Sequence, residues 1–255
     1  MMSATPQQRP GEAPAEPSAD AAVEVVAAAA AQARDAAVAA PAESAADPLA
    51  AAEAARAQAL EEVLAAAAVA FMERGFAATS IDDVARGMGA TKGRVYHYYR
   101  SKLDLFTDVV RRSLERIGAQ VAEAEAEGGT PRERMERMMR VHVRSILKDQ
   151  PWHRCALQGV EMFLRESAAP EQRAAMADLI RLRHDHERLF LRVLDDGMET
   201  GAFRRCDAAT TVRTLLPALN GAVYWYRPRD GETEAHLARI IDEIVAFALG
   251  GLEAR

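Results

Sequence analysis

The chain has 255 residues, of which 49% are hydrophobic and 27% are charged, so it can bury a sizeable core in one large domain or two small ones. Its two cysteines, Cys155 and Cys206, lie far apart, which excludes a disulfide framework and a cysteine zinc site and fits a reducing cytoplasm. The sequence shows neither a run of eighteen apolar residues nor a secretory leader pattern, so we expect a cytoplasmic protein with no membrane partner.

The formal net charge of -6 comes from the N-terminal stretch. Residues 1–54 contain two arginines and eight acidic residues, which account for the whole acidic excess. Alanine with scattered proline dominates this stretch, and it lacks the aromatic residues that a packed core needs. We therefore predict a disordered, acidic Ala/Pro-rich tail over 1–53, with a solvated linker favoured over a functional arm.

Beyond this tail the apolar residues recur with helical spacing, and the sequence predicts an all-α protein of about nine helices. The first helix is expected over about 55–74, because its apolar stripe stops near Gly75, a residue suited to the left-handed conformation. Ser80, with Asp83 three residues later, predicts the capped start of a short second helix. Thr91 is expected to cap the third.

Two short helices joined by a glycine-containing turn, with a basic second helix, are the arrangement that fits the major groove of DNA. The stretch from Thr79 to Lys102 contains five basic residues and two acidic ones, so its net charge is positive, whereas that of the tail is negative. Arginine and lysine in the first turn of the helix after Thr91 can donate hydrogen bonds to guanine O6 and N7. Gly93, which has no side chain, lets the helix backbone come close to the DNA. Helical spacing turns four side chains outward: Thr91, Lys92, Arg94 and His97. Tyr96 and Lys102 are predicted to contact phosphates.

Caps and breakers divide the remaining chain into longer helices. Ser101 precedes a helix reaching about Glu127, and Thr130 with Glu133 forms a capping box that begins a helix ending before Pro151. The other helices are predicted over about 152–166, 170–201, 207–226 and 232–250. Apolar stripes on the last two need covering, either within the monomer or by a second copy of the chain.

An internal ligand cavity would use large apolar side chains with a few polar groups, although each such residue also suits plain core packing. The candidates are Phe106, Met138, His142, Trp152, Phe163 and His184. His184 and His186 cannot share a metal ion without distortion, because residues two apart on a helix point about 200° apart. We predict neither a metal, a cofactor nor a catalytic set of residues.

Two segments, 75–85 and 91–102, resemble the tetracycline-repressor (TetR) family in their Gly-aromatic-Thr turn, their Tyr-His-Tyr-Tyr run and their Ser-Lys junction. The resemblance covers about 50 residues, Arg56 to Phe106. It implies a helix-turn-helix DNA-binding domain over 54–102 and a ligand-sensing and dimerisation domain over 103–255, whose last two helices pair into a four-helix bundle. It further implies phosphate contacts from Thr79 or Ser80, Tyr96 and Lys102, and a groove-lining set of Thr91, Lys92, Gly93, Arg94 and His97. The long Ala-rich extension departs from the family pattern.

The segment Trp225-Tyr-Arg-Pro228, followed by Gly231, is similar to the C-terminal end of an acyl-CoA-responsive TetR subgroup. The alternative is that Pro228 merely ends a helix. The resemblance implies a homodimeric repressor that binds a palindromic operator in double-stranded DNA and is released by a small-molecule ligand, with an acyl-CoA thioester as the candidate class, although the family also contains activators. The competing hypothesis is a helical carrier or enzyme whose basic helix is incidental.

Overall fold

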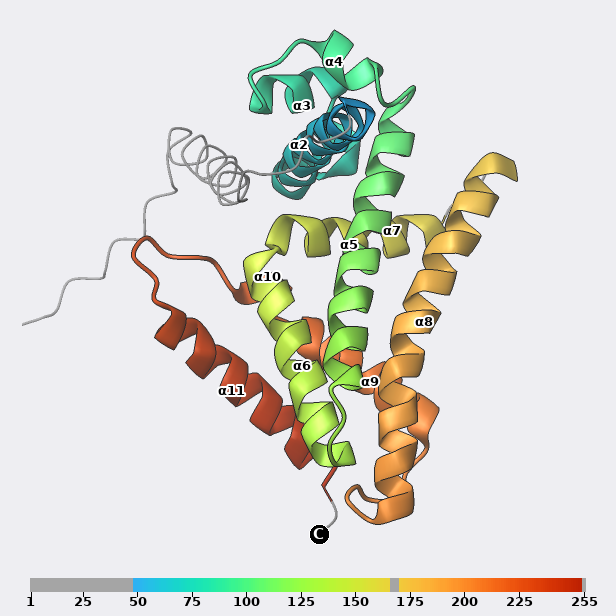
Figure 1. Ribbon diagram of the computed structural model, residues 1–255, viewed down its shortest axis with the longest axis vertical. Coiled ribbons are helices and arrows are strands. Elements are labelled where there is room, and N and C mark those ends of the chain that lie inside the picture. Colours follow the sequence, from blue (N-terminus) through green and yellow to red (C-terminus); the bar gives the residue numbers. More distant parts are fainter. Residues whose placement is uncertain (1–47, 166–169, 254–255) are drawn as a thin grey trace, which may run out of the picture. The chain divides into compact units, whose positions relative to one another are not determined.

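The computed structural model describes residues 48–165 and 170–253. Apart from an isolated bridge between Phe203 and Glu253, all regular secondary structure in these ranges is helical (Figure 1). The prediction of an all-α fold is confirmed. The chain divides into two units, Met1–Glu53 and Ala54–Arg255, and the predicted disorder of the tail concerns residues that lie almost entirely outside the described ranges. Of the described helices, none has the length and apolar character needed to cross a membrane.

Three helices form the N-terminal part: α2 (Pro48–Ala78), α3 (Ile81–Gly87) and α4 (Lys92–Tyr96). Helix α2 begins several residues before the predicted start, because alanine propagates a helix well and proline suits its first turn. Its predicted break at Gly75 is confirmed, since this glycine has φ 75° and ψ 162° between two helical stretches.

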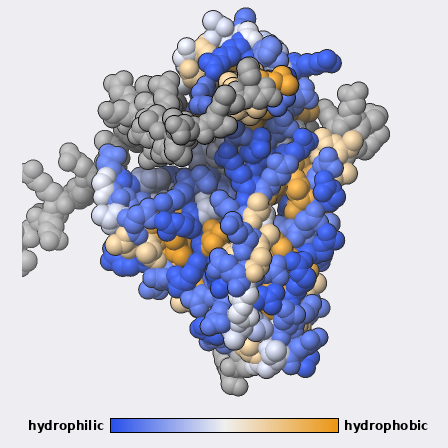
Figure 2. Space-filling model, viewed as in Figure 1, coloured by the Kyte–Doolittle hydropathy of each residue, from blue (hydrophilic) through white to orange (hydrophobic). Residues whose placement is uncertain are grey.

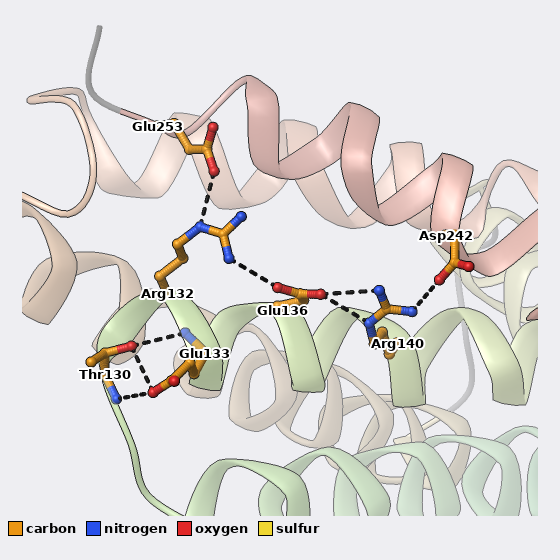
Figure 3. Close-up of polar contacts among 7 residues, drawn as sticks. All are labelled: Thr130, Arg132, Glu133, Glu136, Arg140, Asp242 and Glu253. Atoms are coloured by element: carbon orange, nitrogen blue, oxygen red, sulfur yellow. Dashed lines mark hydrogen bonds and ion pairs between the residues drawn. The ribbon is translucent and has the colours of Figure 1, made fainter.

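Two of the caps that the sequence predicts are present as reciprocal pairs. Ser80 accepts a hydrogen bond from the backbone N–H of Asp83, whose carboxylate accepts one from the Ser80 N–H in return. Thr130 and Glu133 form the same reciprocal pair at the start of α6 (Pro131–Lys148) (Figure 3). Thr91 precedes α4 without a side-chain capping bond. Such caps satisfy backbone donors that the first turn of a helix leaves unpaired.

The C-terminal body is built around α5 (Lys102–Ala126), which packs against α6, α7 (Gln150–Arg165) and α8 (Pro170–Thr200) (Figure 1). The predicted helix over 207–226 is divided into α9 (Ala208–Asn220) and α10 (Ala222–Trp225). Pro217 cannot donate a helical hydrogen bond, and Gly221 has a low helix propensity, so the helix is interrupted at Gly221. The last helix, α11 (Glu234–Gly250), packs on α6 and α9.

A row of ion pairs joins α6 to α11 (Figure 3). Arg132 contacts Glu253 and Glu136, while Arg140 contacts Glu136 and Asp242, so charges of alternating sign run along the seam. Further along α6, two cations, Arg144 and Lys148, share the carboxylate of Glu234. Successive partners on α6 are four residues apart and therefore lie on one face of that helix. The row holds α11 against α6.

Two clusters of buried residues make up the core of the described chain. One lies within α5, α6, α8, α9, α10 and α11. The other joins the N-terminal helices to α5 and α7, with Phe71 of α2 in contact with Phe106 of α5 at a ring-centroid distance of 5.1 Å. The predicted domain boundary near residue 102 thus falls within one continuous core, which couples α5 mechanically to the helix-turn-helix unit.

Candidate nucleic-acid interface

Helices α3 and α4 form a compact helix-turn-helix unit on α2. Their inward side chains are apolar and buried, with Val84 and Val95 fully enclosed and Ile81 and Ala85 nearly so. Tyr99 follows α4, is 5% exposed and donates to Asp108 Oδ2 at 3.0 Å. Burial together with the neighbouring carboxylate raises the pKa of the Tyr99 hydroxyl far above its usual range. The apolar side of α4 is therefore fixed, and its polar side is set by the helical period.

The polar side of α4 is solvent-exposed. All five residues predicted to line the groove are exposed there: Thr91, Lys92, Gly93, Arg94 and His97. Tyr96, the predicted phosphate contact, is 52% exposed. The structure therefore brings these six residues together on one accessible surface of a short basic helix, the arrangement that major-groove recognition needs.

Arg94 has an intramolecular partner that the sequence does not reveal. Its Nη2 donates to Glu62 Oε2 of α2 at 2.7 Å, and both side chains are nearly half exposed. The partners are 32 residues apart in the chain, so no local spacing rule connects them. A single bond of this kind leaves other guanidinium donors for a nucleic acid.

Two predicted phosphate contacts are already engaged within the protein. Thr79 is 2% exposed, and its hydroxyl donates to the carbonyl of Gly75 at 2.7 Å and of Ala70 at 3.1 Å. The turn after Gly75 directs the Thr79 hydroxyl inward, so of the predicted alternatives Thr79 or Ser80 the structure exposes Ser80. Ser80 is exposed, but its hydroxyl bonds the Asp83 carboxylate. This hydroxyl, the bond to the Ser80 N–H and the nearby Arg86 and Arg74 lower the pKa of Asp83 to about 2.

Lys102 is partly buried, and its ammonium group lies at the end of α2. Its Nζ donates to the carbonyls of Phe76 at 2.7 Å and Ala77 at 3.1 Å, and it lies 4.5 Å from the Phe76 ring centroid. A cation in this position satisfies carbonyls that a helix end leaves unpaired. Lys102 therefore stabilises the turn before α3, and that role competes with the predicted phosphate contact.

The predicted ligand-binding residues do not converge on one place. Phe106 and Trp152 belong to the core shared with α2, whereas Met138 and His142 belong to the core of the body. The side chain of Phe163 lies outside the described residues. His184 lies on the exposed side of α8, and its role at a ligand site stays a prediction.

The buried histidine of α8 is His186, which sequence reasoning missed. Its position four residues before the buried Phe190 and seven after the buried Leu179 could have revealed it. His186 Nε2 lies 3.2 Å from His142 Nδ1, and His142 Nε2 lies 2.9 Å from Asn220 Oδ1 of α9. Three helices of the body are thus joined by one buried polar chain.

Burial keeps this chain of histidines uncharged. It lowers the pKa of His142 to about 4 and that of His186 to about 3, since a charged imidazole is poorly solvated there. His153 of α7 behaves alike, with a pKa of about 3 and a hydrogen bond of 3.0 Å to the Ser145 hydroxyl. His186 Nδ1 is buried without a hydrogen-bond partner. Among the described residues, no group of three or more His, Cys, Asp or Glu side chains is arranged to hold a metal ion.

Two surface hollows lie beside α11. One of about 240 Å³ lies along the ion-paired seam with α6 and is lined by Arg132, Glu136, Arg140, Asp242, Val245, Ala246, Leu249, Gly250 and Glu253. The other, about 570 Å³, is open and mostly apolar, and its lining is Ala218, Trp225, His236, Arg239, Ile240, Glu243, Ile244 and Phe247. Of the predicted ligand-binding residues whose side chains the structure describes, none lines either hollow.

The apolar groove, defined by that second set of residues, exposes large side chains. Phe247 of α11 is 80% exposed and Trp225 of α10 is 59% exposed. Orange atoms interrupt the blue surface near α11 in Figure 2, which views the molecule as in Figure 1. Tyr226, next to Trp225, points the other way, is 4% exposed and has its carbonyl bonded by Gln150 Nε2 of α7 at 2.9 Å. The Trp-Tyr pair thus contributes one residue to the surface and one to the core.

An exposed basic helix in a helix-turn-helix unit, joined to an all-α body, defines the class of helix-turn-helix transcription regulators. Comparison with known proteins agrees. Residues 63–109 match the family "Bacterial regulatory proteins, tetR family", and residues 128–252 match "Tetracyclin repressor-like, C-terminal domain". The chain belongs to the tetracycline-repressor family and is a DNA-binding transcription regulator.

Individual relatives give the same result. The TetR-family regulator PfmR from Thermus thermophilus is 32% identical, with 75% of this chain and 99% of that chain covered at a TM-score of 0.63. The transcriptional repressor KstR2 from Rhodococcus jostii (strain RHA1) is 27% identical over 186 residues, which cover 72% of this chain and 86% of the relative. AibR, solved in complex with isovaleryl coenzyme A and operator DNA, shares the fold at 17% identity and a TM-score of 0.61, with 76% and 98% of the two chains covered.

Proposed function

We propose that the chain is a homodimeric repressor in which α4 enters the major groove of a palindromic operator and a small molecule bound in the helical body releases the DNA. The observation that supports this most directly is the exposed polar side of α4, where Lys92, Arg94 and His97 lie beside the backbone of Gly93. Guanine edges are the targets that arginine and lysine at such positions bind best. Repression, rather than activation, is supported by the likeness to KstR2 repressors.

The apolar groove beside α11 is the proposed dimer contact. A surface that exposes Phe247 and Trp225 together needs a covering partner, and a second copy related by a twofold axis supplies the same groove in return. Dimerisation would place two α4 helices about 34 to 36 Å apart, or a near multiple, on one side of the duplex.

The effector is proposed to act through the body, because α5 belongs both to the core around α2 and to the core around α6 and α8. A ligand that favours a different packing of these helices would change the spacing of the two α4 helices. A coupling of about 1 to 3 kcal/mol would already weaken operator binding 5- to 150-fold. An acyl-CoA thioester is the first class to test, given the segment from Trp225 to Pro228.

The test is a binding titration with DNA from upstream of the chain's own gene, using the wild type and Arg94→Ala. We expect the wild type to bind a palindromic duplex more tightly than a scrambled one, and Arg94→Ala to lose about 1 to 3 kcal/mol of discrimination against the wrong base pair. Addition of acyl-CoA thioesters should release the duplex. The proposal is contradicted if the wild type binds the palindromic and the scrambled duplex equally at about 150 mM salt, where sequence-independent phosphate contacts are weakened.

A further inference from the structure

Two consecutive acidic residues of α2 contact different helices. Glu61 pairs with Arg112 at 2.9 Å and Arg116 at 2.5 Å, both on α5. Glu62 instead pairs with Arg94 on α4, with 2.7 Å between Oε2 and Nη2. One carboxylate thus faces the body and its neighbour engages the side of α4 proposed to meet DNA. The two residues are a natural pair for comparison, because they have the same charge and lie side by side.

The Glu62 carboxylate changes what Arg94 gains from a nucleic acid. A phosphate oxygen that approaches Arg94 brings a second negative charge beside the Glu62 carboxylate, so the repulsion between the two charges offsets much of what the contact gains. A guanine edge offers two acceptors, O6 and N7, in the geometry that suits the planar guanidinium. Guanine is uncharged and can accept from the donors that Glu62 leaves free, so the Glu62 carboxylate disfavours a guanine edge less than it disfavours a phosphate.

We infer that Glu62 is a specificity-determining residue of the DNA interface, whose charge disfavours phosphate contacts at Arg94 so that Arg94 strengthens binding mainly where guanine is present. Glu62 is a positioning residue, since it acts through Arg94. The inference rests on the proposed function, in which α4 meets the major groove. It means that α2, which lies outside the helix-turn-helix pair α3 and α4, contributes to the choice of DNA sequence.

The experiment compares Glu62→Gln with its matched control Glu61→Gln in the full chain. Dissociation constants are measured for the operator duplex and a scrambled duplex of equal length, over about 50 to 200 mM salt. We expect Glu62→Gln to bind the scrambled duplex about five- to tenfold more tightly, with a salt slope steeper by about 0.9, as one added phosphate contact requires. Its preference for the operator should narrow accordingly, whereas Glu61→Gln should keep the wild-type preference.

A second comparison isolates the route through Arg94. In an Arg94→Ala background, Glu62→Gln should leave the preference unchanged, because the partner it releases is absent. The inference is overturned if Glu62→Gln keeps the wild-type preference, if Glu61→Gln narrows it equally, or if the effect persists without Arg94. Should Glu62→Gln fail to fold, Glu62→Asp retains the charge on a shorter side chain and is expected to narrow the preference less. A wild type without any operator preference would contradict the proposed function itself, and so is distinguished from failure of this inference alone.

Discussion

The polar side chains around the helix-turn-helix unit form two groups: some stabilise the unit, and others are exposed on the surface proposed to contact DNA. Thr79 and Lys102 both direct polar groups at carbonyls near the end of α2, where Gly75 interrupts the helix. Lys92 and His97 lie exposed on α4. Residue type alone does not separate the two groups, since a lysine occurs in each. Burial and hydrogen-bond partners do.

Replacement of Lys102 is expected to destabilise the fold. Lys102→Ala leaves the carbonyls of Phe76 and Ala77 without their charged donor, which should cost about 1 to 2 kcal/mol in the free energy of unfolding. Lys92→Ala, a control at an exposed position of α4, should leave stability within about 0.5 kcal/mol of the wild type. Urea unfolding followed by circular dichroism measures both. Equal stability of the two variants would refute the structural role of Lys102.

The buried histidines predict acid sensitivity. The pKa of His186 is lowered in the folded state, so the unfolded chain takes up a proton below about pH 6.5 that the folded chain refuses. The stability contributed by His186 is therefore present above pH 6.5 and is lost as the pH falls towards about 3, with a slope of about 1.4 kcal/mol per pH unit for each such histidine. His142 and His153 add to it with the same sign.

Unfolding free energies measured between pH 6.5 and 4.5 test this expectation. His186→Asn should unfold with a shallower pH dependence than the wild type, by about one proton. If His186→Asn retains the full slope, the buried position of His186 does not set the acid sensitivity.

At the scale of the elements, local signals were enough to predict where α3 and α6 begin. Ser80 and Thr130 have their capping partners three residues away, so the printed sequence contains both halves of each interaction. The interruption of α2 at Gly75 is predicted by an equally local signal, the glycine itself. Contacts between elements could not be predicted in this way. The Arg94–Glu62 pair joins α4 to α2 across 32 residues, so no helical spacing connects the two side chains.

The apolar groove beside α11 gives a prediction about dimerisation. Phe247→Glu places a charge at the most exposed apolar side chain of α11 and should yield monomers, because an unpaired carboxylate would be buried in the dimer contact. Ile180→Glu introduces the same charge at an exposed apolar position of α8 outside the groove and should leave the dimer intact. Sedimentation velocity distinguishes the two. A dimeric Phe247→Glu variant would place the contact elsewhere.

For the whole molecule, the acidic overall charge and the basic reading helix are compatible because they belong to different parts of the chain. The family and the all-α fold were predictable from the segment Gly75 to Lys102, since its turn, aromatic run and helix junction occur together. The effector site was much less predictable. Its candidates are apolar residues that also build cores, and the structure distributes them between two clusters. Packing, rather than residue type, decides which of them could face a ligand.

Hydroxyl-radical footprinting of the upstream DNA tests the central claim most directly, because it reports which stretches of the sugar-phosphate backbone the protein covers and whether they have a twofold arrangement. With the wild type, we expect two protected windows whose centres lie about 10 to 10.5 base pairs apart, or a multiple of that spacing. Phe247→Glu at the same concentration should lose both windows, since each monomer then binds alone and weakly. A single protected window that Phe247→Glu leaves unchanged, or no protection at low salt, would contradict a dimer that reads a palindrome with α4.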